Sequence, residues 1–433
     1  MKIAYITAGA GGMFCGSCLH DNTLVTALIA QGHDALLIPT YTPMRTDERD
    51  VSIHRVFFGG INVFLQQKLA LFRHTPRLLD RLLDGRGLLR LVSRLAVKTK
   101  AEDLGDLTVS MLKGEHGYQR KEVERLVDWL AEEVRPDIVN LTNVLLSGIV
   151  HEVKRRLRVP VLGTLQGDDV FIEYLPERCR AEVLRLIREH CREMDGFIAT
   201  SGYYADFMAG YLEIPRERIH VVYPGLNLAG HGGPRTSNVT YTIGYFARIC
   251  PEKGLHNLVE AFRILRQMPD APPGRLRVSG WLGDDCRAYL DDLVGRLQAA
   301  GLAEDFEHVE CPNHDSKVRF LQSLDVLSVP TTYREPKGLY VLEALANGVP
   351  VVQPRHGSFP ELIEATGGGL LVEPDNPQDL ARGLHQLVTD TRLRHQLGQQ
   401  GKQAVCERFH AERMARETAE VYSGYLGAPA PVA

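Results

Sequence analysis

The chain has 433 residues, of which 44% are hydrophobic and 24% charged, as is ordinary for a protein of two or three globular domains. Its formal net charge of −4 argues against a general nucleic-acid binder, and no apolar run is long enough to span a membrane. Eight cysteines without a secretion signal predict reduced thiols and a cytoplasmic protein.

Strands and helices alternate at the start of the chain. Residues 2–7 and 33–39 have the pattern of buried strands, residues 8–16 form a glycine-rich loop, and residues 20–31 have the pattern of a helix. This order is typical of a parallel sheet that binds ligands near the carboxyl ends of its strands. The glycines do not fit a dinucleotide fingerprint, because Phe14 stands where a third glycine is required. A dehydrogenase is therefore a poor interpretation.

A CxxC pair, Cys15 and Cys18, stands at the start of that helix, where a thiolate would be stabilised. No second CxxC or Cys/His pair follows at zinc spacing, so the sequence lacks the ligands of a metal site. Small packing residues in a tight turn are the favoured interpretation, and a redox-sensitive thiol pair is the alternative.

Residues 57–117 depart from the alternation and are interpreted as an irregular helical insertion. Between residues 68 and 100, nine Lys or Arg stand against two acids, a local charge of +7. Four of these basic residues repeat every four positions and so share one helical face: Arg86, Arg90, Arg94 and Lys98. We expect this stretch to contact an anionic membrane surface, as a peripheral protein would, or an anionic acceptor; a solvated face is the alternative.

The alternation returns after the insertion, and residues 197–201 are expected to close the strand series of this domain. Residues 160–169 read as a strand with polar groups at its carboxyl end. Gln166, Asp168 and Asp169 are therefore candidates to bind hydroxyls of a donor or an acceptor. Aspartates that form a turn are the alternative.

Residues 227–240 are rich in helix and strand breakers and are predicted to link a first domain (1–226) to a second (241–411). The second domain opens with a strand, a basic loop and a helix, an arrangement suited to a diphosphate. Arg248 can fork onto two phosphate oxygens, and Lys253 adds a point charge. Surface charges at a helix start are the alternative.

The stretch from Ser328 to Val352 reads as strand, tight loop, short helix and strand. Gly338 ends the loop, and residues 339–347 have helical spacing. Gly348 fits the left-handed position after a helix. The loop and the helix each carry one carboxylate.

Those carboxylates are Glu335 in the loop and Glu343 in the helix. The first N–H groups of a short helix attract an anion, so Gly338 and Leu339 are expected to bind a phosphate. Glu343 would then accept hydrogen bonds from a diol such as a ribose, and Glu335 from the hydroxyls of a second ring. A capped helix with two solvated glutamates is the alternative.

Glu335, seven intervening residues and then Glu343-Ala-Leu-Ala-Asn-Gly-Val-Pro-Val-Val resemble the donor-binding motif of retaining glycosyltransferases of family 4. This resemblance implies the GT-B fold, in which two doubly wound, Rossmann-like α/β domains face a cleft. It also implies that a C-terminal helix, residues 412–433, crosses back to the N-terminal acceptor-side domain.

The same resemblance implies roles for residues in both domains. Gly11 and Gly12 would lie against the donor phosphates and the acceptor, while Arg248 and Lys253 would neutralise the departing nucleotide diphosphate. Many relatives carry a histidine where this chain has Gln166. Because glutamine does not titrate, a mechanism that needs a histidine base at that position is excluded.

The sequence thus predicts a retaining transferase that moves a hexose from a nucleotide-diphosphate sugar to an acceptor hydroxyl. Glu335, Arg248 and Lys253 are the predicted catalytic residues. No cofactor or metal is expected, since two cations stand in for a metal, and no nucleic-acid partner is expected. The acceptor would be a saccharide, a lipid-linked molecule or a small molecule. An epimerase or phosphorylase of the same fold, or a non-catalytic sugar-nucleotide binder, stays open as the alternative.

Overall fold

The computed structural model describes residues 1–9, 15–58, 66–67, 101–234 and 240–427. Its contacts divide the chain into two compact units. Unit 1 consists of Met1–Thr200, Tyr204–Val222 and Ala415–Ala433, and unit 2 consists of Ser201–Tyr203 and Tyr223–Met414. Within the described residues, no helix combines the length and apolarity needed to cross a bilayer.

Unit 1 is built on six parallel strands in the order β2-β1-β3-β4-β5-β6. The strands are β1 (Lys2–Thr7), β2 (Asp34–Pro39), β3 (Ile138–Leu141), β4 (Val161–Leu165), β5 (Gly196–Ala199) and β6 (Ile219–Val221). Strands β3, β4 and β5 are buried along their whole length, as expected where helices cover both faces of a parallel sheet. The expectation that residues 197–201 close the series is wrong, because β6 pairs with β5 and forms the edge.

The helices of unit 1 are α1 (Gly16–Ala30), α5 (Ala101–Leu112), α6 (Arg120–Trp129), α7 (Val150–Leu157), α8 (Asp168–Glu173), α9 (Glu177–Glu193), α10 (Gly202–Leu212) and the end of α18 (Ala411–Leu426). Helix α1 begins at Gly16, four residues before the predicted His20, and Cys18 is the buried residue of its first turn. Helix α18 starts in unit 2 and enters unit 1 at Ala415, where Tyr422 is fully buried.

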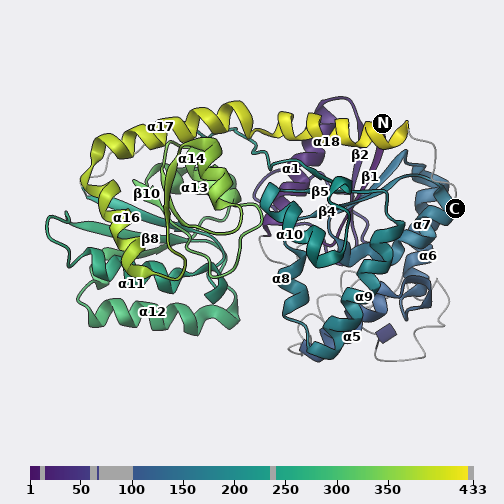
Figure 1. Cartoon of the computed structure of the whole chain (residues 1–433), viewed down its shortest axis with the longest axis horizontal. Helices are drawn as coiled ribbons and strands as arrows, with labels where there is room; N and C mark the ends of the chain where they lie inside the picture. The colour runs from purple at the N-terminus through teal and green to yellow at the C-terminus, as the bar shows by residue number, and fades with distance from the viewer. Residues whose placement is uncertain (10–14, 59–65, 68–100, 235–239, 428–433) are drawn as a thin grey trace. The chain divides into compact units, whose positions relative to one another are not determined.

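Unit 2 contains a second sheet of six parallel strands, in the order β12-β11-β10-β7-β8-β9. The strands are β7 (Tyr241–Phe246), β8 (Gly274–Ser279), β9 (Phe306–Val309), β10 (Val326–Leu327), β11 (Val351–Pro354) and β12 (Gly369–Val372). The helices are α11 (Leu255–Leu265), α12 (Arg287–Ala299), α13 (His314–Gln322), α14 (Leu339–Ala346), α15 (Phe359–Thr366), α16 (Pro377–Thr389) and α17 (Thr391–Arg408). In Figure 1, α11 and α12 lie on one side of this sheet, and α13 and α14 on the other.

The continuous part of unit 2 begins at Tyr223, four residues before the predicted linker starts at residue 227. Leu226 forms an isolated parallel bridge with His410, in which the Leu226 N–H donates to the carbonyl of Phe409 and the Ala411 N–H donates to the carbonyl of Leu226. Residues 235–239 of the predicted linker lie outside the described residues.

Both sheets reverse their strand order once, so both units are doubly wound α/β units, as predicted. The reversal lies between β1 and β3 in unit 1 and between β7 and β10 in unit 2. In open parallel sheets, ligands bind beyond the carboxyl ends of the strands at this reversal. The segments that follow β1, β3, β7 and β10 are therefore where a site is expected.

Candidate functional site

The segment after β10 forms the predicted loop and short helix. Gly338 caps the N-terminus of α14 with φ of 62°, in the left-handed region that favours glycine. The Cβ of any other residue there would lie 2.8 Å from Leu362 Cδ1, so the turn has little space for a side chain. This geometry places Glu335 in the loop and Glu343 on α14, with only 3% and 4% of their surfaces exposed.

Four residues, Lys253, Tyr333, Glu335 and Tyr340, form what we call the Glu335 cluster. Glu335 Oε2 accepts hydrogen bonds from Lys253 Nζ at 2.6 Å, from Tyr333 Oη at 2.7 Å and from Tyr340 Oη at 3.1 Å. Lys253 Nζ also donates to Tyr333 Oη at 2.6 Å. The other carboxylate oxygen, Oε1, accepts from the Gly338 N–H at 3.4 Å. A buried carboxylate is thus held by one cation and two phenols.

These contacts decide the ionisation of the cluster. Burial alone would raise the pKa of Glu335, but the charge of Lys253 and the hydrogen bonds from Lys253 and Tyr333 outweigh it and lower that pKa to about 2. Burial and the charge of Glu335 raise the pKa of Tyr333 and Tyr340 well above its usual value. Lys253 Nζ lies 5.0 and 5.2 Å from the two tyrosine ring centroids. At neutral pH the cluster therefore contains a carboxylate and two protonated phenols.

The loop after β7 delivers the two predicted cations to this region. A 3₁₀ turn, Pro251–Lys253, ends at Gly254, whose φ of 72° turns the chain into α11. A Cβ at Gly254 would clash with the carbonyl oxygen of Pro330 after β10, so the two loops pack tightly. Lys253 is buried, whereas Arg248 is exposed and acts electrostatically on the phenol of Tyr333.

The second predicted carboxylate has a cationic partner that the sequence analysis did not single out. Lys317 Nζ lies 2.7 Å from Glu343 Oε1, and both side chains are about 95% buried. Lys317 lies on α13 on the same face as the buried Phe320 and Leu321. The available signal was the spacing of Lys317, three and four residues before the apolar Phe320 and Leu321.

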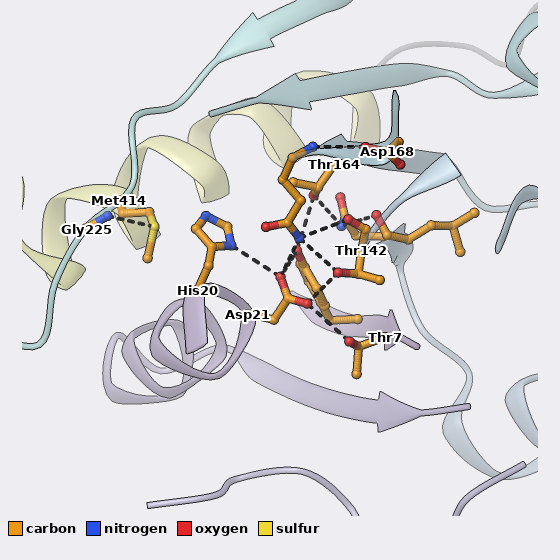
Figure 2. A network of polar contacts seen from close by, with 12 residues as sticks. Thr7, His20, Asp21, Thr142, Thr164, Asp168, Gly225 and Met414 are labelled. Atoms are coloured by element: carbon orange, nitrogen blue, oxygen red, sulfur yellow. Dashed lines mark hydrogen bonds and ion pairs between the residues drawn. The ribbon is translucent and has the colours of Figure 1, made fainter. Parts of the chain in front are cut away.

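In unit 1, polar side chains gather around Asp21, which is fully buried on α1 (Figure 2). Asp21 accepts hydrogen bonds from the hydroxyls of Tyr5 at 2.9 Å, of Thr7 at 3.2 Å and of Thr142, and its Oδ1 lies 3.2 Å from His20 Nδ1. Thr7 is the last residue of β1, and Thr142 directly follows β3. This Asp21 network therefore lies at the strand reversal of unit 1. The sequence analysis missed Asp21.

Gln166 joins this network through its amide nitrogen. Nε2 donates to Asp21 Oδ1 at 3.1 Å and lies 3.0 and 2.9 Å from the carbonyl and hydroxyl oxygens of Thr142. Asn140 on β3 donates to Thr164 Oγ1 at 2.9 Å. These contacts fix which way the carboxamide of Gln166 faces.

The two predicted aspartates after β4 accept hydrogen bonds from groups of the protein. Asp168 accepts the backbone N–H groups of Val144 at 2.8 Å and Gln166 at 3.1 Å, and Asp169 Oδ1 accepts from Tyr204 Oη at 2.6 Å. Burial raises the pKa of Asp168 to about 6, against the opposing effect of the two N–H groups. Asp168 therefore ties the segment after β3 to the turn that follows β4. Binding of a donor or acceptor hydroxyl by Asp168 or Asp169 stays a prediction.

Several predicted features lie outside the described residues, namely Gly11, Gly12 and the basic stretch from 68 to 100. They stay predictions. Cys15 precedes α1, and Cys18 is buried in its first turn. In the part of the chain that the structure describes, no three His, Cys, Asp or Glu side chains are grouped so that they would hold a metal ion.

Two family models match the chain, one mainly in unit 1 and one in unit 2. The model described as Glycosyltransferase Family 4 matches residues 108–229, and the one described as Glycosyl transferases group 1 matches residues 235–404. An uncharacterized glycosyltransferase of Methanocaldococcus jannaschii is 28% identical over 71% of this chain and 76% of that protein. A D-inositol 3-phosphate glycosyltransferase of Jonesia denitrificans is 29% identical over 48% of this chain, which spans only 51% of that relative.

Solved structures of similar fold cover nearly the whole chain. Sucrose-phosphate synthase from Thermosynechococcus elongatus superposes with a TM-score of 0.73 at 18% identity, over 99% of this chain and 100% of that chain. Anabaena HepE in complex with UDP superposes with a TM-score of 0.69 at 17% identity, over 98% and 100%. With the matched family models and the two doubly wound units, these findings identify the chain as a GT-B glycosyltransferase of family 4 type.

Proposed function

We propose that this glycosyltransferase moves a hexose from a nucleotide-diphosphate sugar to an acceptor hydroxyl, with retention of configuration at the anomeric carbon. The observation that carries the proposal is the Glu335 cluster, which places a buried cation and a buried carboxylate 2.6 Å apart at the strand reversal of unit 2. A nucleotide sugar has the matching chemistry, because its anionic diphosphate is bonded to a ring rich in hydroxyls.

The names of similar proteins support this donor class. HepE structures are described in complex with UDP and with UDP-glucose. Relatives include a lipopolysaccharide core biosynthesis mannosyltransferase of Rhizobium meliloti, 28% identical over 54% of this chain and 67% of that protein, whose name denotes transfer of a hexose. The D-inositol 3-phosphate glycosyltransferases are named for a phosphorylated cyclic polyol.

In the proposed reaction, the bond from the acceptor oxygen to the anomeric carbon forms while the bond from that carbon to the diphosphate breaks. Negative charge grows on the departing diphosphate, and the sugar becomes oxocarbenium-like. Lys253, Arg248 and the N–H groups at Gly338 and Leu339 would stabilise the diphosphate by fixed electrostatics. Glu335 would orient the sugar and offset its positive charge. A diphosphate oxygen would accept the proton of the acceptor hydroxyl.

Glu343 would bind the ribose diol of the donor, with Lys317 holding its carboxylate in place. In unit 1, Gln166 would bind a hydroxyl of the donor or the acceptor, oriented by Asp21 and Thr142. Metal and cofactor are not part of this proposal, because Lys253 and Arg248 supply the charge that the leaving diphosphate requires.

Incubation of the protein with UDP-, GDP- and ADP-sugars and a panel of hydroxyl acceptors tests the proposal. We expect release of one nucleoside diphosphate that depends on acceptor, with an α-linked product from an α-linked donor by NMR. A product of inverted configuration would contradict retention. An altered free sugar nucleotide would instead indicate an epimerase, and turnover only with phosphate and a disaccharide would indicate a phosphorylase.

A further inference from the structure

The Glu335 cluster contains a closed triangle of hydrogen bonds. Lys253 Nζ donates to Glu335 Oε2 and to Tyr333 Oη, both at 2.6 Å, and Tyr333 Oη donates to the same Oε2 at 2.7 Å. A phenol has one proton, and here it is directed to the carboxylate, while a lone pair accepts from the ammonium. Tyr333 is thus the side chain that bridges the cation and the anion.

The contacts also show which hydrogen-bonding groups of Lys253 and Glu335 are not used within the Glu335 cluster. An ammonium has three N–H donors, and within the described residues two of those of Lys253 are used. Among the contacts of the described residues, Glu335 Oε2 accepts three hydrogen bonds, whereas Oε1 accepts one, at 3.4 Å. The third N–H of Lys253 and the Oε1 atom of Glu335, which accepts one long hydrogen bond, are therefore the groups of the cluster that can bind a ligand.

We infer that Tyr333 is a positioning residue, which locks Lys253 and Glu335 as one unit so that the third N–H binds a donor phosphate oxygen and Oε1 binds a sugar hydroxyl. This inference rests on the proposed function. Without the phenol hydroxyl, the carboxylate can rotate about its last bond and exchange its two oxygens, and the ammonium can turn toward the carboxylate alone. Both charges would persist, but their orientation would be lost.

Loss of orientation has a kinetic signature different from loss of charge. A nucleoside diphosphate carries its full charge in the bound state and depends on Lys253 being cationic, so its affinity should change little. The transition state requires diphosphate and sugar to be held at once, and misplacement of reacting groups lowers the rate about 10-fold to 100-fold. Tyr333→Phe should therefore lower kcat about 10-fold or more and change the Kd for UDP, GDP or ADP less than about 3-fold.

Tyr340 supplies a matched control. Its hydroxyl donates to the same Oε2 at 3.1 Å, and its ring lies 5.2 Å from Lys253 Nζ, but no hydrogen bond joins it to Lys253 among the described contacts. Tyr340→Phe thus removes one hydrogen bond to the carboxylate and leaves the bridge intact. We expect a smaller fall in kcat than for Tyr333→Phe. Tyr289→Phe, which removes a hydroxyl bonded to His256, should leave kcat unchanged.

The experiment measures kcat and KM with the donor found among UDP-, GDP- and ADP-sugars, and the Kd of the corresponding nucleoside diphosphate by calorimetry. Equal kcat values for Tyr333→Phe and Tyr340→Phe, or wild-type kcat in Tyr333→Phe, would overturn the inference. If Lys253→Ala also retains full turnover, the proposed site itself fails. If Lys253→Ala is inactive and Tyr333→Phe is not, only the role of Tyr333 fails.

A second measurement needs no substrate. The charged and titratable groups that face Glu335 are Lys253, Lys337, Tyr333, Tyr340 and His356. Loss of the Tyr333 hydroxyl should move the acid limb of unfolding to higher pH, and loss of the Tyr340 hydroxyl should move it less. A uniform loss of stability at all pH values, with an unmoved acid limb, would show that Tyr333 only fills space and would contradict the inference.

Discussion

Asp21 in unit 1 and Glu335 in unit 2 are both buried beside a strand reversal, and the two carboxylates are held in different ways. Asp21 in unit 1 accepts from three hydroxyls and an amide and lies 3.2 Å from His20 Nδ1, and no lysine or arginine is among its described contacts. Glu335 in unit 2 accepts from a lysine and two phenols. Hydroxyl and amide donors hold a carboxylate in a fixed position, whereas a lysine can redirect its hydrogen bonds to an anionic ligand when it binds. We therefore assign orientation to the first cluster and charge stabilisation to the second.

Removing the cation should have the largest effect. Lys253→Met is expected to lower kcat/KM about 10²-fold to 10³-fold, the scale of losing one fixed electrostatic contact. The substitution also removes the positive charge that Lys253 places beside the buried Glu335, and this loss costs roughly 3–5 kcal/mol of unfolding free energy. Steady-state kinetics and urea unfolding measure the two effects.

The double variant Lys253→Met with Glu335→Gln separates them. It removes both charges, so stability should recover relative to Lys253→Met, while activity should not. Arg248→Ala is expected to lower kcat/KM about 10²-fold without loss of stability, because Arg248 is exposed. Near-normal turnover in Lys253→Met and Arg248→Ala would place the reaction elsewhere.

Substitutions of Lys317 and Glu343 test whether this second ion pair of unit 2 also binds the donor. Glu343→Ala is expected to lower kcat/KM about 10²-fold, since a buried carboxylate that binds a diol is lost. Glu343→Gln combined with Lys317→Met keeps the volumes similar and removes both charges. If the pair is only structural, this double variant will have the wild-type KM for the donor; we expect a raised KM.

Asp21→Asn tests the neutral cluster. The amide would place an N–H group among donors that now point at an oxygen, which costs about 1–3 kcal/mol of unfolding free energy. Thr7→Val, which removes one hydroxyl donor, should cost about 1 kcal/mol. Urea unfolding checks both values. Wild-type stability in Asp21→Asn would mean that the network does not hold a charged carboxylate.

The remaining expected effects concern pH, and the two units should differ in sign. Glu335 has its pKa lowered from 4.5 to about 2, so its stabilisation is present above pH 4.5 and is lost as pH falls toward 2. Asp168 has its pKa raised from 3.8 to about 6, so its contribution is present below pH 3.8 and is lost as pH rises through 6.

Unfolding free energies measured between pH 2 and pH 7 check these signs. Glu335→Gln should flatten the acid limb, and Asp168→Asn should flatten the decline between pH 3.8 and pH 6. If both variants alter the same limb, the assignment of opposite signs is wrong.

The sequence was informative where chemistry lies within one short segment. The loop and helix from Glu335 to Glu343 were predicted because glycine, proline and helix formers follow each other within a few turns. The parallel order of both sheets followed from alternating strands and helices. The structure confirms both of these predictions.

Partners distant along the chain could not be predicted in the same way. Lys253 and Glu335 are 82 residues apart, and Gln166 and Asp21 are 145 apart, so no local pattern relates them. Asp21 was missed because it lies on a helix that is buried on most sides, where a polar side chain does not interrupt a periodic stripe. Its role depends on hydroxyls that β1 and the residue after β3 bring together.

Helix α18 has a consequence for how the protein is made. Unit 1 contains residues up to Val222 and then, after all of unit 2, the segment that buries Tyr422 and sets Tyr425 Oη 2.9 Å from His220 Nε2. On the ribosome, that segment emerges roughly 200 residues later, a delay of about 10–40 s at usual elongation rates. Until that segment is synthesised, part of the interior of unit 1 is exposed to solvent. Unit 2 can therefore finish folding before unit 1.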